Sequence, residues 1–407
     1  MDFFPILSTL RRHRIATGLI VLEIALTCAI VSNSIFLIGD RLSRMDRPSG
    51  VTEDEVVRVE ITGMTRSRRD AGAVTAQDLR ALKGIPGVVS TAVTNAIPFG
   101  GSAWNTGVST VPDDPSPPVD AAQYLASPEL LQSLGVTVTT GRDFSPEDCV
   151  DFEAVLTNTA QITSVIITRG VADRLFPGKN PLGQAVYAWG KDPQRVVGVI
   201  EQLARPSDDA GAKNAAYAVI MPATMAYADG GNYLLRVAPG RSAEVLAAVD
   251  AVINKVAPER LILSRQTFAE IRSDYFKQDR AMARLLVVIC IALMSITALG
   301  IIGLTTFWVQ QRTRQIGTRR ALGATRHDIV RYFQTENFIL STLGILIGMT
   351  LGYAINAWLM SAYNVPRMPG YFLPIGAALL WLLGQVAVLG PALRAAMVSP
   401  AIATRTV

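Results

Sequence analysis

Four long apolar segments dominate the pattern of hydrophobic and polar positions along this 407-residue chain. They cover about residues 15–38, 284–309, 333–360 and 372–390. Each meets the roughly 20-residue length that an α-helix needs to cross a hydrocarbon core, so the pattern predicts four transmembrane helices. About 240 residues of mixed polarity separate the first two, which is enough for a folded domain with two subdomains.

The long segment between the first two predicted helices contains one pattern twice. A strand is followed by a helix with apolar residues at three- and four-residue spacing, and then by a second strand. The first copy covers residues 56–62, 75–84 and 88–94, and the second covers 233–238, 242–257 and 260–266. Two such βαβ units predict a ferredoxin-like sandwich, whereas the alternative is chance, because short βαβ patterns are common. Between the copies, residues 96–231 predict an inserted, mostly β subdomain, with an exposed loop at the proline-rich residues 111–118.

The charges beside the apolar segments predict the topology. Residues 310–331 carry six arginines against one acid, Asp328, and the positive-inside rule places such a segment in the cytoplasm. Both chain ends are then cytoplasmic, and residues 40–283 are extracytoplasmic. The net charge is −4 for residues 40–283 and +9 for the rest of the chain. The basic excess at the inner face indicates topology and contact with membrane lipids, with no nucleic-acid partner.

Polar residues inside the first predicted helix leave alternatives open. Its apolar part of about 24 residues exceeds the 7 to 15 of a secretory signal, so an uncleaved anchor is favoured over a removed signal. Glu23 and Asn33 lie within this helix, where polar groups are costly and usually face protein or a cavity. A hydrogen-bonded structural role for Glu23 is favoured over a proton or substrate site.

The sequence contains no self-contained catalytic constellation. It has no G-x-x-x-x-G-K-[ST] motif that would cradle a nucleotide. Its two histidines, His13 and His327, both lie at the predicted inner face, which excludes a histidine-based metal site or a Ser-His hydrolase in the outer domain. Cys28 and Cys290 lie in predicted helices, so Cys149 has no disulfide partner in the outer domain. We therefore expect no catalytic residue, no metal and no cofactor bound by this chain.

The arginine-rich segment predicts a helical elbow. No breaker interrupts the second transmembrane helix, so it is expected to continue to Leu322, and Gly323 suits the following position, where φ > 0 is needed. Thr325 and Asp328 then form a capping box that begins the next helix. A solvated arginine loop without a partner is the alternative, but defined caps and a small apolar tip at Ala321 and Leu322 favour a contact surface.

Two further patterns concern helix packing and helix continuity. Gly344, Gly348 and Gly352 form one face of the third predicted helix, and G-x-x-x-G faces allow close backbone approach in lipid. This predicts packing against either the chain's own helices or a second subunit. Residues 268–286 contain no breaker, which predicts a continuous helix running into the second transmembrane helix. Such a rod would transmit movement of the span to the outer domain, and a plain linker is the alternative.

These segments resemble one transporter family. The stretch QRTRQIGTRRALGATRHDIVRYFQTENFILSTLGILIG closely resembles the core signature of the MacB/FtsX-type permeases of ABC transporters, and PALRAAMVSPAIATR (391–405) resembles their C-terminal ending. In the outer domain, GRDFSPED (141–148), VIITRGVADRLFPGKNPLGQAV (165–186) and RVVGVI (195–200) are similar to the family's periplasmic core domain.

The resemblance implies a division of the chain and a fold class. The fold class is membrane α-helical, with four transmembrane helices, plus an α+β extracytoplasmic domain with ferredoxin-like βαβ halves and an inserted mostly-β subdomain. The expected divisions are a cytoplasmic N-terminus (1–14), transmembrane helices (15–38, 284–309, 333–360, 372–390), a periplasmic domain (39–283; porter-like 50–95 and 232–268, inserted 96–231), a cytoplasmic coupling elbow (310–332), a short periplasmic loop (361–371) and a cytoplasmic C-terminus (391–407).

The resemblance also implies partners. Only about 14 residues precede the first span, so the ATPase that MacB carries fused is expected here as a separate ABC ATPase chain, which would bind ATP and Mg. The permease would work as a homodimer or as a heterodimer with a related permease in a bacterial inner membrane. A periplasmic adaptor and an outer-membrane duct are further expected partners. By motif, the ATPase-coupling residues would be Gly317, Thr318, Arg319, Arg320, Ala321, Leu322, Gly323, Ala324 and Thr325.

The implied function is export of a periplasmic substrate by mechanotransmission, in which ATP hydrolysis moves the spans and the outer domains follow. One alternative within the superfamily is an FtsX-like regulator or a lipoprotein-extracting permease. An alternative of another class is a membrane sensor or scaffold without transport. ATPase activity of the co-purified complex would separate this last alternative from the transporters.

Overall fold

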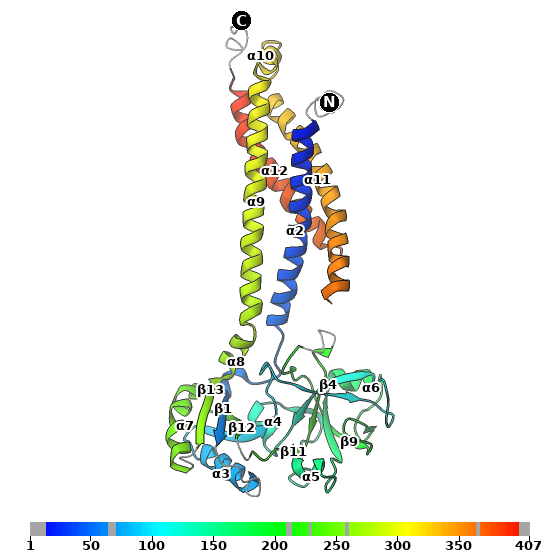
Figure 1. Ribbon diagram of the computed structural model, residues 1–407, viewed down its shortest axis with the longest axis vertical. Helices are drawn as coiled ribbons and strands as arrows, with labels where there is room; N and C mark the ends of the chain where they lie inside the picture. Colours follow the sequence, from blue (N-terminus) through cyan, green and yellow to red (C-terminus); the bar gives the residue numbers. More distant parts are fainter. Residues whose placement is uncertain are drawn as a thin grey trace. The chain divides into compact units, whose positions relative to one another are not determined.

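The chain forms two compact units, Met1–Asp46 with Gln278–Val407 and Arg47–Lys277, which are described separately as the membrane unit and the globular unit. The structure is a computed structural model that describes residues 14–63, 71–208, 214–227, 230–256, 260–363 and 367–398. Figure 1 shows the elements of both units.

Four long helices build the membrane unit: α2 (Arg14–Met45), α9 (Lys277–Gln311), α11 (Arg326–Tyr363) and α12 (Phe372–Ala396). Each is long and apolar enough to cross a membrane by length and composition, in agreement with the predicted fold class. The helices extend beyond the apolar segments because polar residues with good helix propensity flank them. α2, for example, continues through Arg41 and Arg44 and ends before Pro48, since the residue before a proline disfavours helical geometry.

α2 lies against both α11 and α12. The core between these helices includes Ile24 and Cys28 from α2, Ile345 from α11 and Val388 from α12, each at most 2% exposed. α9 buries less of its surface within the described chain, and large side chains such as Leu299 remain exposed on it. The exposed apolar surface of α9 is compatible with lipid.

The ferredoxin-like subdomain of the globular unit is confirmed by its topology. Its elements are β1 (Val56–Gly63), α3 (Ala71–Lys83), β2 (Val88–Thr94), β12 (Gly230–Val237), α7 (Ser242–Val256) and β13 (Arg260–Thr267). The strand order is β13-β1-β12-β2, with antiparallel neighbours throughout. Each βαβ unit is thus split by a strand of the other unit. One core joins the strands to both helices, with Val59, Leu235, Leu82 and Val249 all fully buried.

The insertion is built mainly of strands, as predicted. The strands are β3 (Trp104–Val108), β4 (Val119–Leu125), β5 (Val138–Gly141), β6 (Val150–Asp151), β7 (Ser164–Thr168), β8 (Ala185–Val186), β9 (Gln194–Ile200), β10 (Ala218–Met221) and β11 (Ala223–Thr224). The larger sheet has the order β3-β4-β10-β7-β9-β5, with β8 paired to β9, and β6 pairs with β11. The proline-rich residues 111–118 connect β3 to β4 as a mostly exposed loop. The short helices are η1 (Glu53–Glu55), α4 (Leu130–Leu134), α5 (Phe152–Leu156) and α6 (Arg169–Leu175), of which η1 precedes β1.

The predicted continuous helix over residues 268–286 is wrong. α8 (Phe268–Tyr275) is followed by Phe276, which is not helical, and α9 begins at Lys277. No proline or glycine causes this break. Phe276 is 1% exposed, and its ring lies 5.2 Å from that of Phe99 and 4.8 Å from that of Tyr275. Burial of this aromatic cluster outweighs helix propensity, which is a weak preference.

The predicted extension of the second transmembrane helix to Leu322 is also wrong. α9 ends at Gln311, and a separate helix, α10 (Thr313–Ala321), follows Arg312. The Thr313 hydroxyl donates to the carbonyl oxygens of Val309 at 3.0 Å and Gln310 at 2.9 Å. Such back-bonding by threonine bends helices.

Candidate functional site

The elbow (residues 310–332) is a short helix held between two long ones. α10 ends at Ala321 with Leu322 as its C-cap, and Gly323 follows with φ 100°. This is the left-handed conformation that the sequence predicts, and a Cβ at Gly323 would meet nothing within 4 Å. Backbone geometry, and not a lack of space, therefore calls for glycine here.

A reciprocal cap begins the next helix, as predicted. The Thr325 hydroxyl and amide both donate to Asp328 Oδ2, at 2.6 and 2.9 Å, and the Asp328 amide donates to Thr325 Oγ1 at 3.3 Å. This capping box satisfies two backbone donors at the start of α11. The turn of the elbow is thus defined by local chemistry on both sides.

One face of α10 is buried and the other is open. Ile316 and Gly317 are buried, and Ile316 packs in the cluster that contains Ile329 and Phe333 of α11. Leu322, at the tip, is 84% exposed. Of the residues assigned to coupling, Gly317 is buried, Arg320 and Ala324 are half-buried, and Thr318, Arg319, Ala321, Leu322, Gly323 and Thr325 are exposed. The elbow therefore offers a large apolar side chain on an otherwise polar surface.

Sequence reasoning missed a buried ion pair at the base of the elbow. Arg312 Nη1 lies 3.0 Å from both Oε1 and Oε2 of Glu336, and the two side chains are 11% and 2% exposed. The Arg312 guanidinium also lies 5.4 Å from the ring centroid of Trp308. An acid near the start of a predicted apolar helix was the available signal, because such residues usually have a partner.

The glycine face of α11 lies against α2. A Cβ at Gly348 would come within 2.5 Å of Cys28 Cβ and 2.6 Å of the Ala25 oxygen. At Gly344 the corresponding atom would lie 2.8 Å from Ile24, and at Gly352 it would lie 3.3 Å from Ala29. The sequence leaves open which helix packs against this glycine face, and the structure shows that it is α2, the chain's own first long helix.

The polar residues of α2 also have neighbours within the membrane unit. Asn33 Nδ2 donates to the carbonyl oxygens of Ala29 and Gly352, at 3.0 and 2.9 Å. Glu23 lies beside Gly300 of α9, where a Cβ would come within 2.7 Å of Glu23 Oε2. Asn33 has a hydrogen-bonded role, and the close approach of Glu23 to α9 is compatible with the structural role expected for it.

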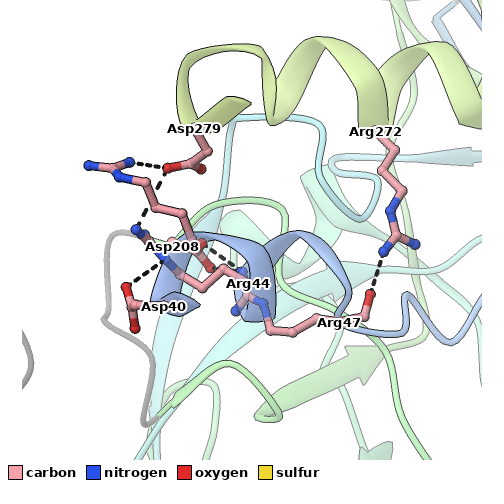
Figure 2. A network of polar contacts seen from close by, with 7 residues as sticks. Asp40, Arg44, Arg47, Asp208, Arg272 and Asp279 are labelled. Atoms are coloured by element: carbon pink, nitrogen blue, oxygen red, sulfur yellow. Dashed lines mark hydrogen bonds and ion pairs between the residues drawn. The ribbon is translucent and has the colours of Figure 1, made fainter. Parts of the chain in front are cut away.

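At its other end, the membrane unit joins α2 to α9 by ion pairs. Arg41 pairs with Asp279, Arg44 Nη2 lies 3.6 Å from Asp279 Oδ1, and Arg44 Nε lies 3.3 Å from Asp40. Figure 2 shows the side chains of Asp40 and Arg44, from the end of α2, beside that of Asp279 at the start of α9. The first turn of α9 is thereby fixed to the last turns of α2.

The globular unit holds its own two chain segments at this junction. Arg272 of α8 donates to the Arg47 carbonyl oxygen at 2.7 Å, pairs with Glu53 and lies 5.2 Å from the Phe99 ring centroid. The Arg47 side chain pairs with Asp208 at 2.6 Å, as Figure 2 also shows. The two chain segments that connect the units are therefore held to each other by polar contacts, both within the globular unit and within the membrane unit.

Cys149, the outer cysteine, is half-buried. Burial raises the pKa of its thiol to about 11, and the nearby carboxylates of Asp148 and Asp143 add to the shift. A thiol with a raised pKa is a poor nucleophile at neutral pH. Within the described ranges, no group of three His, Cys, Asp or Glu side chains could hold a metal ion.

Comparisons with known proteins agree with this architecture. The model of the MacB-like periplasmic core domain matches residues 17–252, which is more than half of the chain, and the model of the FtsX-like permease C-terminal region matches residues 287–400. The chain is 28% identical to a macrolide export ATP-binding/permease protein MacB from Shewanella over 237 residues, covering 56% of this chain and 34% of that protein. It is 26% identical to the ABC transporter permease YknZ of Bacillus subtilis over 244 residues, covering 59% of this chain and 61% of that one.

A solved structure, the periplasmic region of MacB from Actinobacillus actinomycetemcomitans, superposes with a TM-score of 0.35 at 12% identity, covering 57% of this chain and 97% of that one. The chain spans less than two thirds of the length of the two curated relatives named above. The two family models nevertheless match residues 17–252 and 287–400, which include most of the globular unit and most of the last three long helices. The chain belongs to the MacB/FtsX family of ABC transporter permeases.

Proposed function

We propose that this chain is a permease subunit that couples ATP hydrolysis by a separate cytoplasmic ABC ATPase to movement of its periplasmic domain, for export of a periplasmic substrate. The observation that carries the proposal is the elbow, in which Leu322 is 84% exposed on a helix end with caps on both sides. An exposed aliphatic side chain on a capped turn can serve as an anchor that inserts into an apolar pocket of a partner. Permeases of this family work with ABC ATPases, which supports an ATPase as that partner.

The proposal includes an orientation. The elbow and both chain ends face the cytoplasm, and the globular unit faces the periplasm of a bacterial inner membrane. The arginines of the elbow support this orientation, because positively charged loops are retained on the cytoplasmic side. A homodimer or a heterodimer with a related permease, a periplasmic adaptor and an outer-membrane duct complete the proposed assembly. Its Shewanella relative is named for macrolide export, which makes macrolides the first substrates to try.

The test is recovery of an ATPase with the full-length permease. Affinity purification from membranes, followed by mass spectrometry and an ATPase assay, should yield an ABC ATPase with the wild-type chain. Leu322→Glu should lower that yield at least tenfold, because a carboxylate placed in an apolar contact loses its hydration. Leu156→Glu is the matched control, since Leu156 is 53% exposed on the globular unit, and it should retain the ATPase.

Two outcomes would contradict the proposal. If no ATPase is recovered with the wild-type chain under conditions that preserve the membrane assembly, a sensor or scaffold is the better reading. If Leu322→Glu recovers as much ATPase as Leu156→Glu, the elbow tip is not the docking point.

A further inference from the structure

A buried ion pair between Arg312 and Glu336 stabilises the junction between α9 and α10. We propose that Arg312 and Glu336 are positioning residues that set the direction of α10, and through it the presentation of Leu322 to the ATPase. The inference rests on the proposed function of the elbow. It deepens that function by naming the residues that orient the docking helix without contacting the partner.

Arg312 connects three helices. It stands between the end of α9 at Gln311 and the start of α10 at Thr313. Its carbonyl oxygen accepts the first α10 bond, from Ile316 N at 2.9 Å, while its own amide donates to Trp308 O of α9 at 3.0 Å. The side chain meanwhile reaches Glu336 on α11. Backbone and side chain of a single residue thus join α9, α10 and α11.

The surroundings of the pair restrict its geometry. Nη1 is equidistant, at 3.0 Å, from the two carboxylate oxygens, and the guanidinium is 5.4 Å from the Trp308 ring centroid, with Trp308 only 4% exposed. A planar guanidinium that both stacks on an aromatic ring and binds a carboxylate has few alternative positions. The rotation of α10 about Arg312 is therefore limited by contacts on two sides.

A second contact between α10 and α11 lies near the end of α10. The Arg319 guanidinium lies 5.0 Å from the ring centroid of Tyr332. Tyr332 precedes Glu336 by four residues, so the two lie on one face of α11. α10 is thus held to the same face of α11 at both its start and its last turn.

A role in stability alone is distinguishable from a role in positioning. Removing one partner of a buried ion pair leaves an uncompensated charge and destabilises a protein, whereas removing both charges together leaves no uncompensated charge. If the pair only stabilises the fold, a doubly neutral variant should behave like wild type in every respect. If the pair sets the direction of α10, the variant with both residues neutral should fold normally, but α10 should adopt a broader range of orientations relative to α11.

The experiment measures the direction of α10 directly. In a background with Cys28, Cys149 and Cys290 replaced by serine, spin labels at Thr318→Cys on α10 and Leu343→Cys on α11 report the distance distribution by pulsed electron paramagnetic resonance. Both labelled positions are exposed. The variants are Arg312→Gln, Glu336→Gln and the double Arg312→Gln/Glu336→Gln. Arg284→Gln, which changes an exposed arginine of α9 outside the elbow, is the matched control for loss of charge.

We expect the double variant to melt at the wild-type temperature, to show a broader distance distribution and to bind the ATPase recovered with wild-type permease at least tenfold more weakly. Arg284→Gln should match wild type in all three. If a single variant fails to insert, Arg312→Lys replaces it, because lysine keeps the charge but lacks the planar fork, and it should insert and broaden the distribution. A wild-type distribution in the double variant and in Arg312→Lys would overturn the inference.

The same measurements separate the two proposals. A broadened distribution with unchanged ATPase affinity would support positioning by Arg312 and Glu336 and contradict docking at the elbow. Loss of the ATPase in Leu322→Glu, together with a wild-type distribution in the double variant, would support docking and contradict positioning.

Discussion

Single polar side chains connect segments of this protein that are distant in sequence. In the membrane unit, Asn33 of α2 donates to a carbonyl oxygen of α11 at Gly352. In the globular unit, the buried Asp78 accepts from Tyr233 at 2.6 Å and pairs with Arg260. Buried polar groups are costly unless they are hydrogen-bonded, so each of these contacts fixes a unique neighbour for its helix.

Cys149 should be slow to react and strongly dependent on pH. The thiolate is the reactive species, and burial with two nearby acids raises the pKa of this thiol to about 11. In a variant with serine at Cys28 and Cys290, labelling by a membrane-impermeant maleimide should therefore accelerate about tenfold per pH unit from pH 7 to pH 9. A plateau near pH 9 would indicate an ordinary thiol and contradict this environment.

The same reagent tests the proposed orientation through a matched position. Cys149 should be labelled from the periplasmic side, whereas Thr313→Cys at the elbow should be labelled only after the membrane is permeabilised. Labelling of Thr313→Cys in intact spheroplasts would overturn the proposed four-span topology.

At the scale of elements, small residues decide which helices touch. The α2 and α11 backbones approach so closely at Gly348 that an added Cβ would lie 2.5 Å from Cys28 Cβ. Dispersion contacts and close backbone approach drive such packing in lipid, since apolar burial against another helix gains little over burial in lipid tails.

Gly348→Leu should separate α2 from α11. Overpacking costs roughly 1 to 3 kcal/mol, so the melting temperature of the purified protein should fall by several degrees. Gly303→Leu is the matched control, because a Cβ at Gly303 on α9 meets nothing within 4 Å, and its melting temperature should stay at the wild-type value. Equal melting temperatures for the two variants would show that the glycine face does not pack against α2.

At the scale of the whole molecule, two chain segments link the units, and each unit holds both segments together. α9 begins only after the break at Phe276, so the stiff part of the proposed lever is α9 itself and not a helix that runs on from α8. The ion pairs of Asp279 fix the first turn of α9 to α2. Transmission of movement would then involve α2 and α9 as a pair.

Insertion of Gly-Gly-Pro after Asp279 should uncouple ATP turnover from export. Proline removes a backbone donor and clashes with the preceding turn at a cost of about 3 kcal/mol, and the insertion also separates Asp279 from the rest of α9. ATPase activity of the complex should persist, while export measured in cells should be lost. The same insertion after Pro115, in the exposed loop, should leave both intact. Wild-type export by the Asp279 insertion at equal expression would contradict the lever.

Local sequence signals account for most of the architecture and part of the elbow. Apolar length identified the four long helices, repeated βαβ periodicity identified the ferredoxin-like subdomain, and Gly323, Thr325 and Asp328 identified the turn and its cap, since each of these acts within a few residues along the chain. The domain boundaries and the coupling roles of elbow residues stay predictions.

The tertiary structure alone decided what depends on contacts between distant residues. α8 ends at Tyr275 because the next side chain, Phe276, is buried beside Phe99. Arg312, which follows the end of α9, pairs with Glu336 on another helix. The glycine face of α11 packs against α2, which is also a contact between residues distant in the sequence. Helix propensity differs by less than about 1 kcal/mol between ordinary residues, so packing and buried charge determine where these helices break and which of them touch.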